Sequence, residues 1–482
     1  MSVLRIQYLY LLLLLVATSC KPKPGKDSSL TENLSDATQT GSLLERYVAT
    51  PDTTFKYELR DSVVGDGHVT YFLYMESQRW MTEKEVKNPI WWHWLSITVP
   101  DEVVSDIGLL WIGGGSRSNK LPKETWAPLV DIAKYTKTVT AGLHNVPNQE
   151  TVFVGDDYGP RVEDELIAYG WRQFLERGAK DEDAIWLARL PMTKSAVRAM
   201  DAVSGYCNDE LGKSVNKFTV FGGSKRGWTT WTTAVVDERV VAIAPIVIDM
   251  LNVVPSFENH WQAYGFWAPA VGNYVEEGIM EWQQTEEYKK LMSITEPYSY
   301  RERLTLPKYI VNASGDQFFL PDSWKYYWHD LSGEARLRYV PNADHSLSGS
   351  DAMFGFTAFY KSVVDGTPRP DFDWILEDGK LLLETYPDSK PDSIYLWQAY
   401  NPSARDFRTE TFGRKWEKEI IPISAEGKYE LSIIAPDKGW KAFYAEMVFP
   451  GSGSIPFKFS TGVFITPDSL AYPPYEPKKP PM

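Results

Sequence analysis

Between residues 57 and 366, apolar runs of strand length alternate along the chain with amphipathic segments of helix length. The apolar runs are rich in β-branched and aromatic residues and end in Gly, Asn, Asp or Pro, which is typical of strands. The predicted strands are 68–80, 90–100, 107–112, 137–147, 216–223, 239–251, 308–316 and 335–341. The predicted helices, with apolar positions at helical spacing, are 125–136, 163–178, 193–212, 224–236, 322–331 and 350–366.

Buried strands that alternate with helices predict an α/β fold, in which helices cover both faces of a mostly parallel sheet. The first two apolar runs lie close together and predict antiparallel neighbours. In such sheets the functional side chains lie on loops at the carboxyl ends of the strands. The turns of interest therefore follow "TVFGG", "IVNASG" and "YVPNAD".

The alternation stops in two places. Residues 254–305 contain aromatic-rich helical patterns and no strand, which predicts a helical lid inserted between two sheet strands. After residue 366, short apolar runs separated by turn residues predict an antiparallel β-sandwich over 367–475, followed by a proline-rich tail over 476–482. The α/β domain is thus expected to span 43–366.

The length and the net charge of the chain limit its domain organisation and the kinds of partner that it can bind. A chain of 482 residues is long for one core and agrees with two domains. Its formal charge is −14, which argues against a nucleic-acid partner because binding phosphates needs basic patches.

The N-terminus has the pattern of an export signal. In "MSVLRIQYLYLLLLLVATSC" one arginine precedes a short apolar run, and small residues stand directly before Cys20. This resembles a bacterial lipoprotein signal, so we predict that residues 1–20 are a signal peptide and that Cys20 is acylated. Residues 21–42 would be a flexible tether to the membrane of the bacterial cell envelope. The alternative is a plain secretory signal with an incidental cysteine.

The run "FGGSKRGWTT" joins a predicted strand to a predicted helix and places Ser224 at the turn. A nucleophile elbow has this strand–turn–helix form and needs small residues beside the serine. Gly222 stands two residues before Ser224, but Arg226 occupies the position two residues after it, where glycine is usual, and Gly227 follows. By itself the turn fits a nucleophile and an ordinary serine equally well.

Downstream residues decide between these interpretations. In α/β hydrolases the nucleophile is followed along the chain by an acid and then by a histidine. Asp316 and His345 each follow a predicted strand at its carboxyl end, whereas His329 lies within a predicted helix. Asp322 is the alternative acid, although an N-cap of the helix at 322–331 is the favoured interpretation for it. The catalytic candidates are therefore Ser224, Asp316 and His345.

Acyl transfer also needs N–H donors for the oxyanion of the tetrahedral intermediate. The backbone N–H of Lys225, next to the serine, is one candidate. Gly114 and Gly115, after the strand 107–112, offer the second donor. A simple flexible turn is the alternative explanation for these glycines.

Nothing in the sequence indicates a metal or an organic cofactor. The six histidines are scattered without short ligand spacing. The run "GGGSRS" lacks the glycine pattern of a dinucleotide site, and no P-loop occurs.

Four segments carry a resemblance to a known family: "EDELIAYGWRQFL", "ARLPMTKSAVRAMDAV", "FTVFGGSKRGWTTW" and "SGDQFF…D". They resemble the PhoPQ-activated pathogenicity-related protein family, and the similarity extends from about residue 43 into the β-rich tail. The resemblance implies an α/β-hydrolase fold similar to the catalytic domain of prolyl-oligopeptidase-type peptidases, with a C-terminal β extension. It also implies Ser224, Asp316 and His345 as a hydrolytic triad, and it makes Arg226 an expected residue of the elbow.

Glu163 and Asp164 open a predicted helix. Favourable interaction with the helix N-terminus is the simpler interpretation. A carboxylate pair that binds the amine of a substrate is the alternative.

Together these features predict a serine hydrolase of the cell envelope that cleaves a peptide or a small ester. Peptidase is ranked above esterase by analogy of scaffold alone. The alternative is a non-catalytic binding or signalling protein on the same scaffold.

Overall fold

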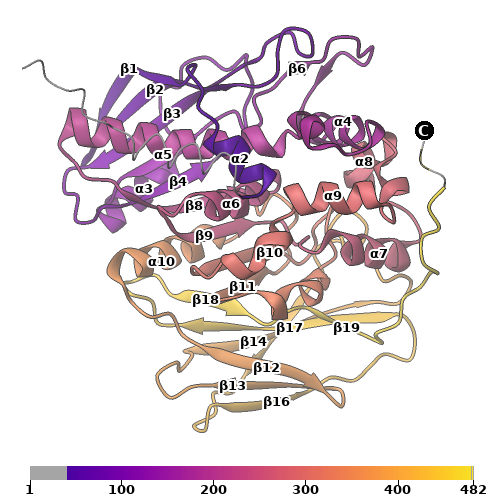
Figure 1. Ribbon diagram of the computed structural model, residues 1–482. Coiled ribbons are helices and arrows are strands. Elements are labelled where there is room, and N and C mark those ends of the chain that lie inside the picture. The colour runs from indigo at the N-terminus through magenta and orange to yellow at the C-terminus, as the bar shows by residue number, and fades with distance from the viewer. Residues whose placement is uncertain (1–40, 479, 481–482) are drawn as a thin grey trace, which may run out of the picture.

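A nine-stranded sheet forms the centre of the computed structural model, which describes residues 41–478 and 480 (Figure 1). Its strand order is β1-β2-β3-β5-β4-β8-β9-β10-β11. The strands are β1 (Lys56–Gly65), β2 (His68–Arg79), β3 (Ile90–Pro100), β4 (Ile107–Ile112), β5 (Thr140–Leu143), β8 (Lys217–Gly223), β9 (Val240–Ile246), β10 (Lys308–Ala313) and β11 (Ala335–Val340). A two-stranded ribbon, β6 (Thr151–Val152) and β7 (Pro160–Arg161), lies outside this sheet.

The sheet is parallel from β5 to β11 and antiparallel from β1 through β3 to β5. This arrangement confirms the predicted mostly parallel α/β sheet. The chain passes from β4 outward to β5 and later returns to the other side of β4 as β8. The strand order therefore reverses at β4 and β8, and in open α/β sheets ligands bind beside the carboxyl ends of the strands at such a reversal.

Helices cover both faces of the sheet. They are α2 (Leu43–Ala49), α3 (Ala127–Thr136), α4 (Glu163–Glu176), η1 (Asp181–Trp186), α5 (Arg189–Leu211), α6 (Lys225–Val236) and α10 (Ala352–Asp365). Because side chains alternate along a strand, Leu110 joins a core with α5 and α6, whereas its neighbour Leu109 joins a core with α3 and α10. The second core continues into the C-terminal strands through residues such as Phe443.

The chain between β9 and β10 is helical, which confirms the predicted insertion. Its elements are α7 (Val253–Tyr264), η2 (Pro269–Val271), α8 (Gly272–Glu276), η3 (Ile279–Trp282), α9 (Glu286–Thr295) and η4 (Pro297–Arg303). The described end of the chain contacts this insertion: the Tyr472 N–H donates to the Gln262 carbonyl, and the Tyr475 hydroxyl donates to Glu281 over 2.6 Å.

The C-terminal region forms two antiparallel sheets, β12-β13-β16 and β15-β14-β17-β18, with β19 on β17. The strands are β12 (Phe372–Glu377), β13 (Lys380–Thr385), β14 (Ser393–Asn401), β15 (Glu417–Ile421), β16 (Lys428–Ser432), β17 (Trp440–Phe449), β18 (Phe457–Ser460) and β19 (Phe464–Thr466). These sheets agree with the predicted β-sandwich. Strand β15 was missed because it is exposed along nearly its whole length and has no alternating apolar pattern.

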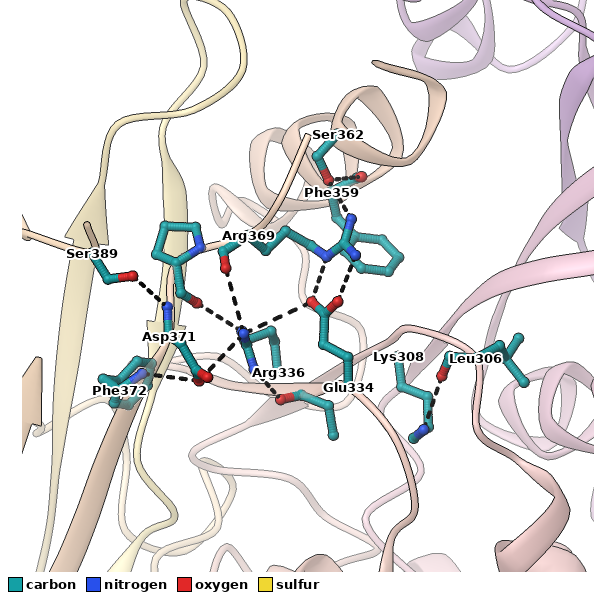
Figure 2. A network of polar contacts seen from close by, with 12 residues as sticks. Leu306, Lys308, Glu334, Arg336, Phe359, Ser362, Arg369, Asp371, Phe372 and Ser389 are labelled. Atoms are coloured by element: carbon teal, nitrogen blue, oxygen red, sulfur yellow. Dashed lines mark hydrogen bonds and ion pairs between the residues drawn. The ribbon is translucent and has the colours of Figure 1, made fainter. Parts of the chain in front are cut away.

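The segment that links the α/β domain to these sheets is held by charged side chains (Figure 2). Arg369 forms an ion pair with Glu334, just before β11. Arg336 on β11 donates from Nε to the Pro370 carbonyl over 2.8 Å and lies 3.3 Å from Asp371. The link is therefore fastened to the edge of the central sheet, and Figure 1 shows the C-terminal sheets beside β11.

The segment 322–331 differs from the prediction. It forms two short 3₁₀ turns, η5 (Ser323–Tyr326) and η6 (Trp328–Asp330), in place of one helix. Between them the backbone of Tyr327 leaves the helical region, and its buried hydroxyl donates to Asp249 over 2.8 Å. Asp322 does not cap the turn with its side chain, so the N-cap interpretation was wrong; it pairs with Arg405.

The predicted signal peptide, Cys20 and the tether up to residue 40 lie outside the described residues. Within the described part of the chain, no helix has both the length and the apolar character needed to cross a membrane.

The buried carboxyl of Asp249 makes stability depend on pH. Burial raises its pKa from 3.8 to about 8, against the lowering effect of hydrogen bonds from Tyr339 and Tyr327, and the charges of Asp316 and Asp322 add to the rise. Below pH 3.8 the carboxyl is protonated in the folded and unfolded chains. Between 3.8 and about 8 only the folded protein keeps the proton, so the free energy of unfolding falls as pH rises.

We therefore expect Asp249→Asn, which cannot ionise, to gain stability relative to wild type between pH 5 and 8. The gain should be at most about 1.4 kcal/mol per pH unit and should level off above pH 8. Urea denaturation of both proteins at several pH values measures it. A constant difference across this range would show that Asp249 is not protonated in the folded state.

Candidate active site

Ser224 occupies a sharp turn between β8 and α6. Its φ of 57° and ψ of −125° lie outside the regions that most side chains adopt, and its N–H donates to the Ile246 carbonyl over 2.8 Å. A Cβ on Gly222 would lie 2.6 Å from the Arg226 carbonyl oxygen, and one on Gly227 would lie 3.0 Å from the Gly222 carbonyl oxygen. The turn therefore needs glycine at 222 and 227, which explains why position 226 is free to carry arginine.

His345 and Asp316 are in direct contact at the carboxyl ends of β11 and β10. Imidazole Nδ1 lies 2.8 Å from Asp316 Oδ2, and Asp316 Oδ1 accepts from the Phe318 N–H over 2.8 Å. The ring of Phe318 packs 4.3 Å from the imidazole, between ring centroids. Nε2 has no hydrogen-bond partner among the described residues. Since Nδ1 faces the carboxylate, Nε2 is the atom that is available to another group.

Ser224 and His345 line the same cavity of about 520 Å³ at the switch point of the sheet. Trp111 and Trp126 line it as well. No hydrogen bond joins Ser224 to His345 within residues 41–478. The structure thus brings Asp316 against His345 and places Ser224 in the same cavity, a looser arrangement of the kind often found in unliganded sites.

Asp322, the alternative acid, is engaged elsewhere. Its Oδ2 lies 2.6 Å from Arg405 Nη2 and 2.8 Å from Lys325 Nζ. Both Asp322 and Arg405 are buried. His329, the other downstream histidine, is exposed on η6. The contacts therefore favour Asp316 and His345 over these two residues.

The candidate oxyanion donors follow adjacent strands, because Ile112 at the end of β4 pairs with Gly222 of β8. The Gly114 carbonyl accepts from the Asn145 N–H, and the Gly115 carbonyl accepts from the Gln149 side chain, each over 2.8 Å. Gly115 has a φ of 147°, which favours glycine. The N–H groups of Gly114, Gly115 and Lys225 donate to no other residue in the described ranges.

Glu163 and Asp164 begin α4 and contact the two cations that follow Ser224. Lys225 Nζ lies 2.9 Å from Glu163 and 3.0 Å from Asp164, and Arg226 Nη2 lies 2.5 Å from Glu163. Burial would raise the pKa of Glu163, but Arg226 and Lys225 outweigh it and lower the pKa to about 2. A substrate amine would have to displace these cations, so the geometry favours a structural role for the pair.

A loop of the C-terminal region, residues 402–416, reaches the strand ends that carry Asp316 and His345. The Thr409 N–H donates to the carbonyl of Gly315, over 3.0 Å. Asn342 and the backbone of Trp416 exchange two hydrogen bonds of 2.9 Å. Sequence reasoning missed these contacts, because they join positions far apart and no local pattern marks them.

A direct serine–histidine contact lies elsewhere in the described part of the molecule. Ser77 Oγ lies 3.0 Å from His93 Nε2 and 3.1 Å from Ser195 Oγ. All three residues are fully buried, and burial lowers the pKa of His93 to about 4. This cluster is a satisfied core contact. Among residues 41–478, no three His, Cys, Asp or Glu side chains are grouped as a metal ion requires.

The model of the PhoPQ-activated pathogenicity-related protein family matches residues 44–408, which is most of the chain. The chain belongs to this family. The match confirms the resemblance seen in the sequence. In this PhoPQ-related chain the matched segment contains the elbow, Asp316, His345 and the first half of the 402–416 loop.

Other known proteins resemble this PhoPQ-related chain. Autocrine proliferation repressor protein A from Dictyostelium discoideum is 36% identical over 457 residues, which cover 89% of the chain and 91% of that protein. Among solved structures, an acetyl xylan esterase from Paenibacillus sp. R4 has a TM-score of 0.47 and 15% identity, covering 71% of this chain and 97% of that one. A glucuronoyl esterase from Solibacter usitatus has a TM-score of 0.38 and 12% identity, covering 66% and 87%.

Proposed function

We propose that this protein is a serine hydrolase that cleaves a peptide or a small ester through an acyl-enzyme. The observation that carries the proposal is the grouping of Asp316, His345 and Ser224 at the switch point of the sheet. Asp316 engages Nδ1 of His345, Nε2 is left without a partner, and the same cavity holds Ser224 on its strained turn.

The chemistry follows from these positions. A serine hydroxyl becomes an effective nucleophile when a neutral imidazole removes its proton, so His345 Nε2 accepts the proton as Ser224 Oγ bonds to the carbonyl carbon. Asp316 keeps the neutral imidazole of His345 in the tautomer that carries its proton on Nδ1, and it stabilises the imidazolium that forms when Nε2 accepts the serine proton. The backbone N–H groups of Lys225 and of Gly114 or Gly115 stabilise the oxyanion of the tetrahedral intermediate. The bond to the leaving group then breaks, His345 returns the proton to that group, and water releases the acyl chain in the same way.

Labelling with a fluorophosphonate tests the proposal, because this reagent forms a covalent bond with an activated serine. We expect the wild-type protein to be labelled and Ser224→Ala to remain unlabelled. Ser195→Ala, which removes a serine in the buried core, is the matched control and should be labelled like wild type. A folded wild-type protein that is not labelled, or equal labelling of Ser224→Ala, would reject the proposal.

The location of the protein is a separate proposal. A signal ending at Cys20 would leave a lipid-anchored protein in the bacterial cell envelope, where the tether lets the domains reach substrates near the membrane. Metabolic labelling with a fatty acid should mark the wild-type protein and not Cys20→Ala. Release of both proteins in soluble, unlabelled form would support a plain secretory signal instead.

A second candidate function is binding or signalling on the same scaffold without catalysis. Its support is the similarity over most of the chain to a Dictyostelium protein whose name describes an autocrine repressor of proliferation. If a binding or growth effect of this protein is found, its persistence in Ser224→Ala would favour this candidate over the hydrolase.

A further inference from the structure

Two cavities meet at Ser224 from different sides. The larger, of about 520 Å³, is lined by His345. The smaller, of about 30 Å³, is lined by Arg189, Asp164 and Lys225 together with aromatic side chains, and not by His345. In a serine hydrolase the histidine returns its proton to the leaving group. The leaving group therefore belongs in the larger cavity and the acyl group in the smaller one.

Arg189 lies against the smaller cavity with unused hydrogen-bonding capacity. It is only 4% exposed, and its Nε has no partner among the described residues. One face of the guanidinium stacks on Trp228, 4.5 Å from the ring centroid, and Nη1 donates to the Lys225 carbonyl over 2.9 Å. Stacking restrains a guanidinium, and the row of N–H donors along its edge matches the two oxygens of a carboxylate.

The charges around this cavity do not balance. Among the described residues, Lys225 and Arg226 pair with Glu163 and Asp164, whereas Arg189 forms no ion pair. Lys225 and Arg226 already pair with both carboxylates, and the second oxygen of Asp164 accepts from the Tyr274 hydroxyl over 3.1 Å. Burial lowers the pKa of Arg189, in spite of the nearby Tyr274 and Asp164. A buried cation without a counter-ion is costly, and an anion beside it would offset that cost.

The size of the smaller cavity limits how large a group it can hold. Its volume of about 30 Å³ is far smaller than the 520 Å³ of the cavity beside His345. The small space favours a short acyl group over a long acyl chain.

We propose that Arg189 forms an anion subsite and that the preferred substrates carry a short acyl group ending in a carboxylate. This proposal rests on the serine-hydrolase function proposed above. Arg189 binds the carboxylate while the acyl carbonyl lies at Ser224. The larger cavity takes the leaving group.

Equilibrium binding to Ser224→Ala tests the subsite without requiring turnover. Isothermal titration calorimetry at pH 7 compares monomethyl succinate with methyl 4-methylpentanoate, a neutral ester of nearly the same shape. We expect the carboxylate to bind at least about tenfold more tightly, because a charge-assisted pair is lost in the neutral ester. Arg189→Met in the same background should abolish the preference, and Arg189→Lys should retain part of it.

Lys194→Met is the matched control, because Lys194 is another buried cation of α5 that donates to the Thr50 carbonyl, away from the cavity. It should leave the preference unchanged. Equal binding of the two esters, or a preference that survives in folded Arg189→Met, would overturn the proposal. If Arg189→Met does not fold, the comparison of the two esters and the Arg189→Lys variant decide. Fluorophosphonate labelling reports separately on catalysis, so failure of the subsite and failure of the hydrolase proposal give different results.

Discussion

Replacement of His345 by alanine is expected to lower kcat/KM by at least about a thousandfold while leaving the protein folded. The reason is the geometry of the imidazole, which is oriented by Asp316 through Nδ1 and leaves Nε2 free in the cavity that holds Ser224. Without it the serine proton has no acceptor. Because the side chain is partly exposed, its loss removes less packing than the loss of a core side chain. Steady-state hydrolysis of an ester that the wild type accepts measures the effect.

The matched control is His329→Ala, which removes the exposed histidine on η6 and should leave kcat/KM unchanged. Fluorophosphonate labelling of Ser224 should slow in parallel with hydrolysis in His345→Ala only. If His345→Ala kept most of the activity, Ser224 would have to be activated by another group, and the proposed triad would be wrong.

Loss of Asp322 is expected to destabilise the fold by about 3–5 kcal/mol, because the buried charge of Arg405 would lose its close partner and keep the exposed Asp468, 4.0 Å away. The Arg405 side chain is fully buried, and its pairing with Asp322 joins the 402–416 loop to the segment that follows β10. The same loop contacts Gly315 and Asn342 near Asp316 and His345. Asp322→Ala should therefore lower the urea midpoint and also the activity at temperatures where the protein stays folded.

A double variant tests whether the destabilisation in Asp322→Ala comes from the buried charge of Arg405, which loses its close partner. Asp322→Leu combined with Arg405→Met replaces the ion pair by apolar groups of similar size and should restore much of the stability. Lys325→Met is a milder control, since Lys325 is partly exposed and water can solvate it. If Asp322→Ala were as stable as wild type but inactive, Asp322 would have a catalytic role, contrary to its contacts.

The amino-acid pattern alone predicted much of the fold and of the site. The alternating apolar and amphipathic segments located eight of the nine strands of the central sheet, all except β1, together with helices α3, α4, α5, α6 and α10. This was possible because burial on one or two faces imposes a regular spacing of apolar residues along the sequence. Ser224 could be recognised because its turn needs glycines at fixed neighbouring positions. Asp316 and His345 were found from chain order, since parallel strands bring their carboxyl ends to one edge.

Other features depended on the tertiary structure. Strand β15 has no apolar alternation because it is exposed, and the segment 322–331 is not a regular helix because Tyr327 reaches Asp249. The sequence pattern does not show that Glu163 and Asp164 pair with the cations of the elbow. Nor does it show that Arg189, beside Ser224, forms no ion pair with another described residue. The spacing of apolar residues and the residue preferences of turns depend on neighbours within a few positions, so they can be recognised in the sequence. The pairing of charges between distant segments is set by strand order and packing, and so it was decided only by the folded chain.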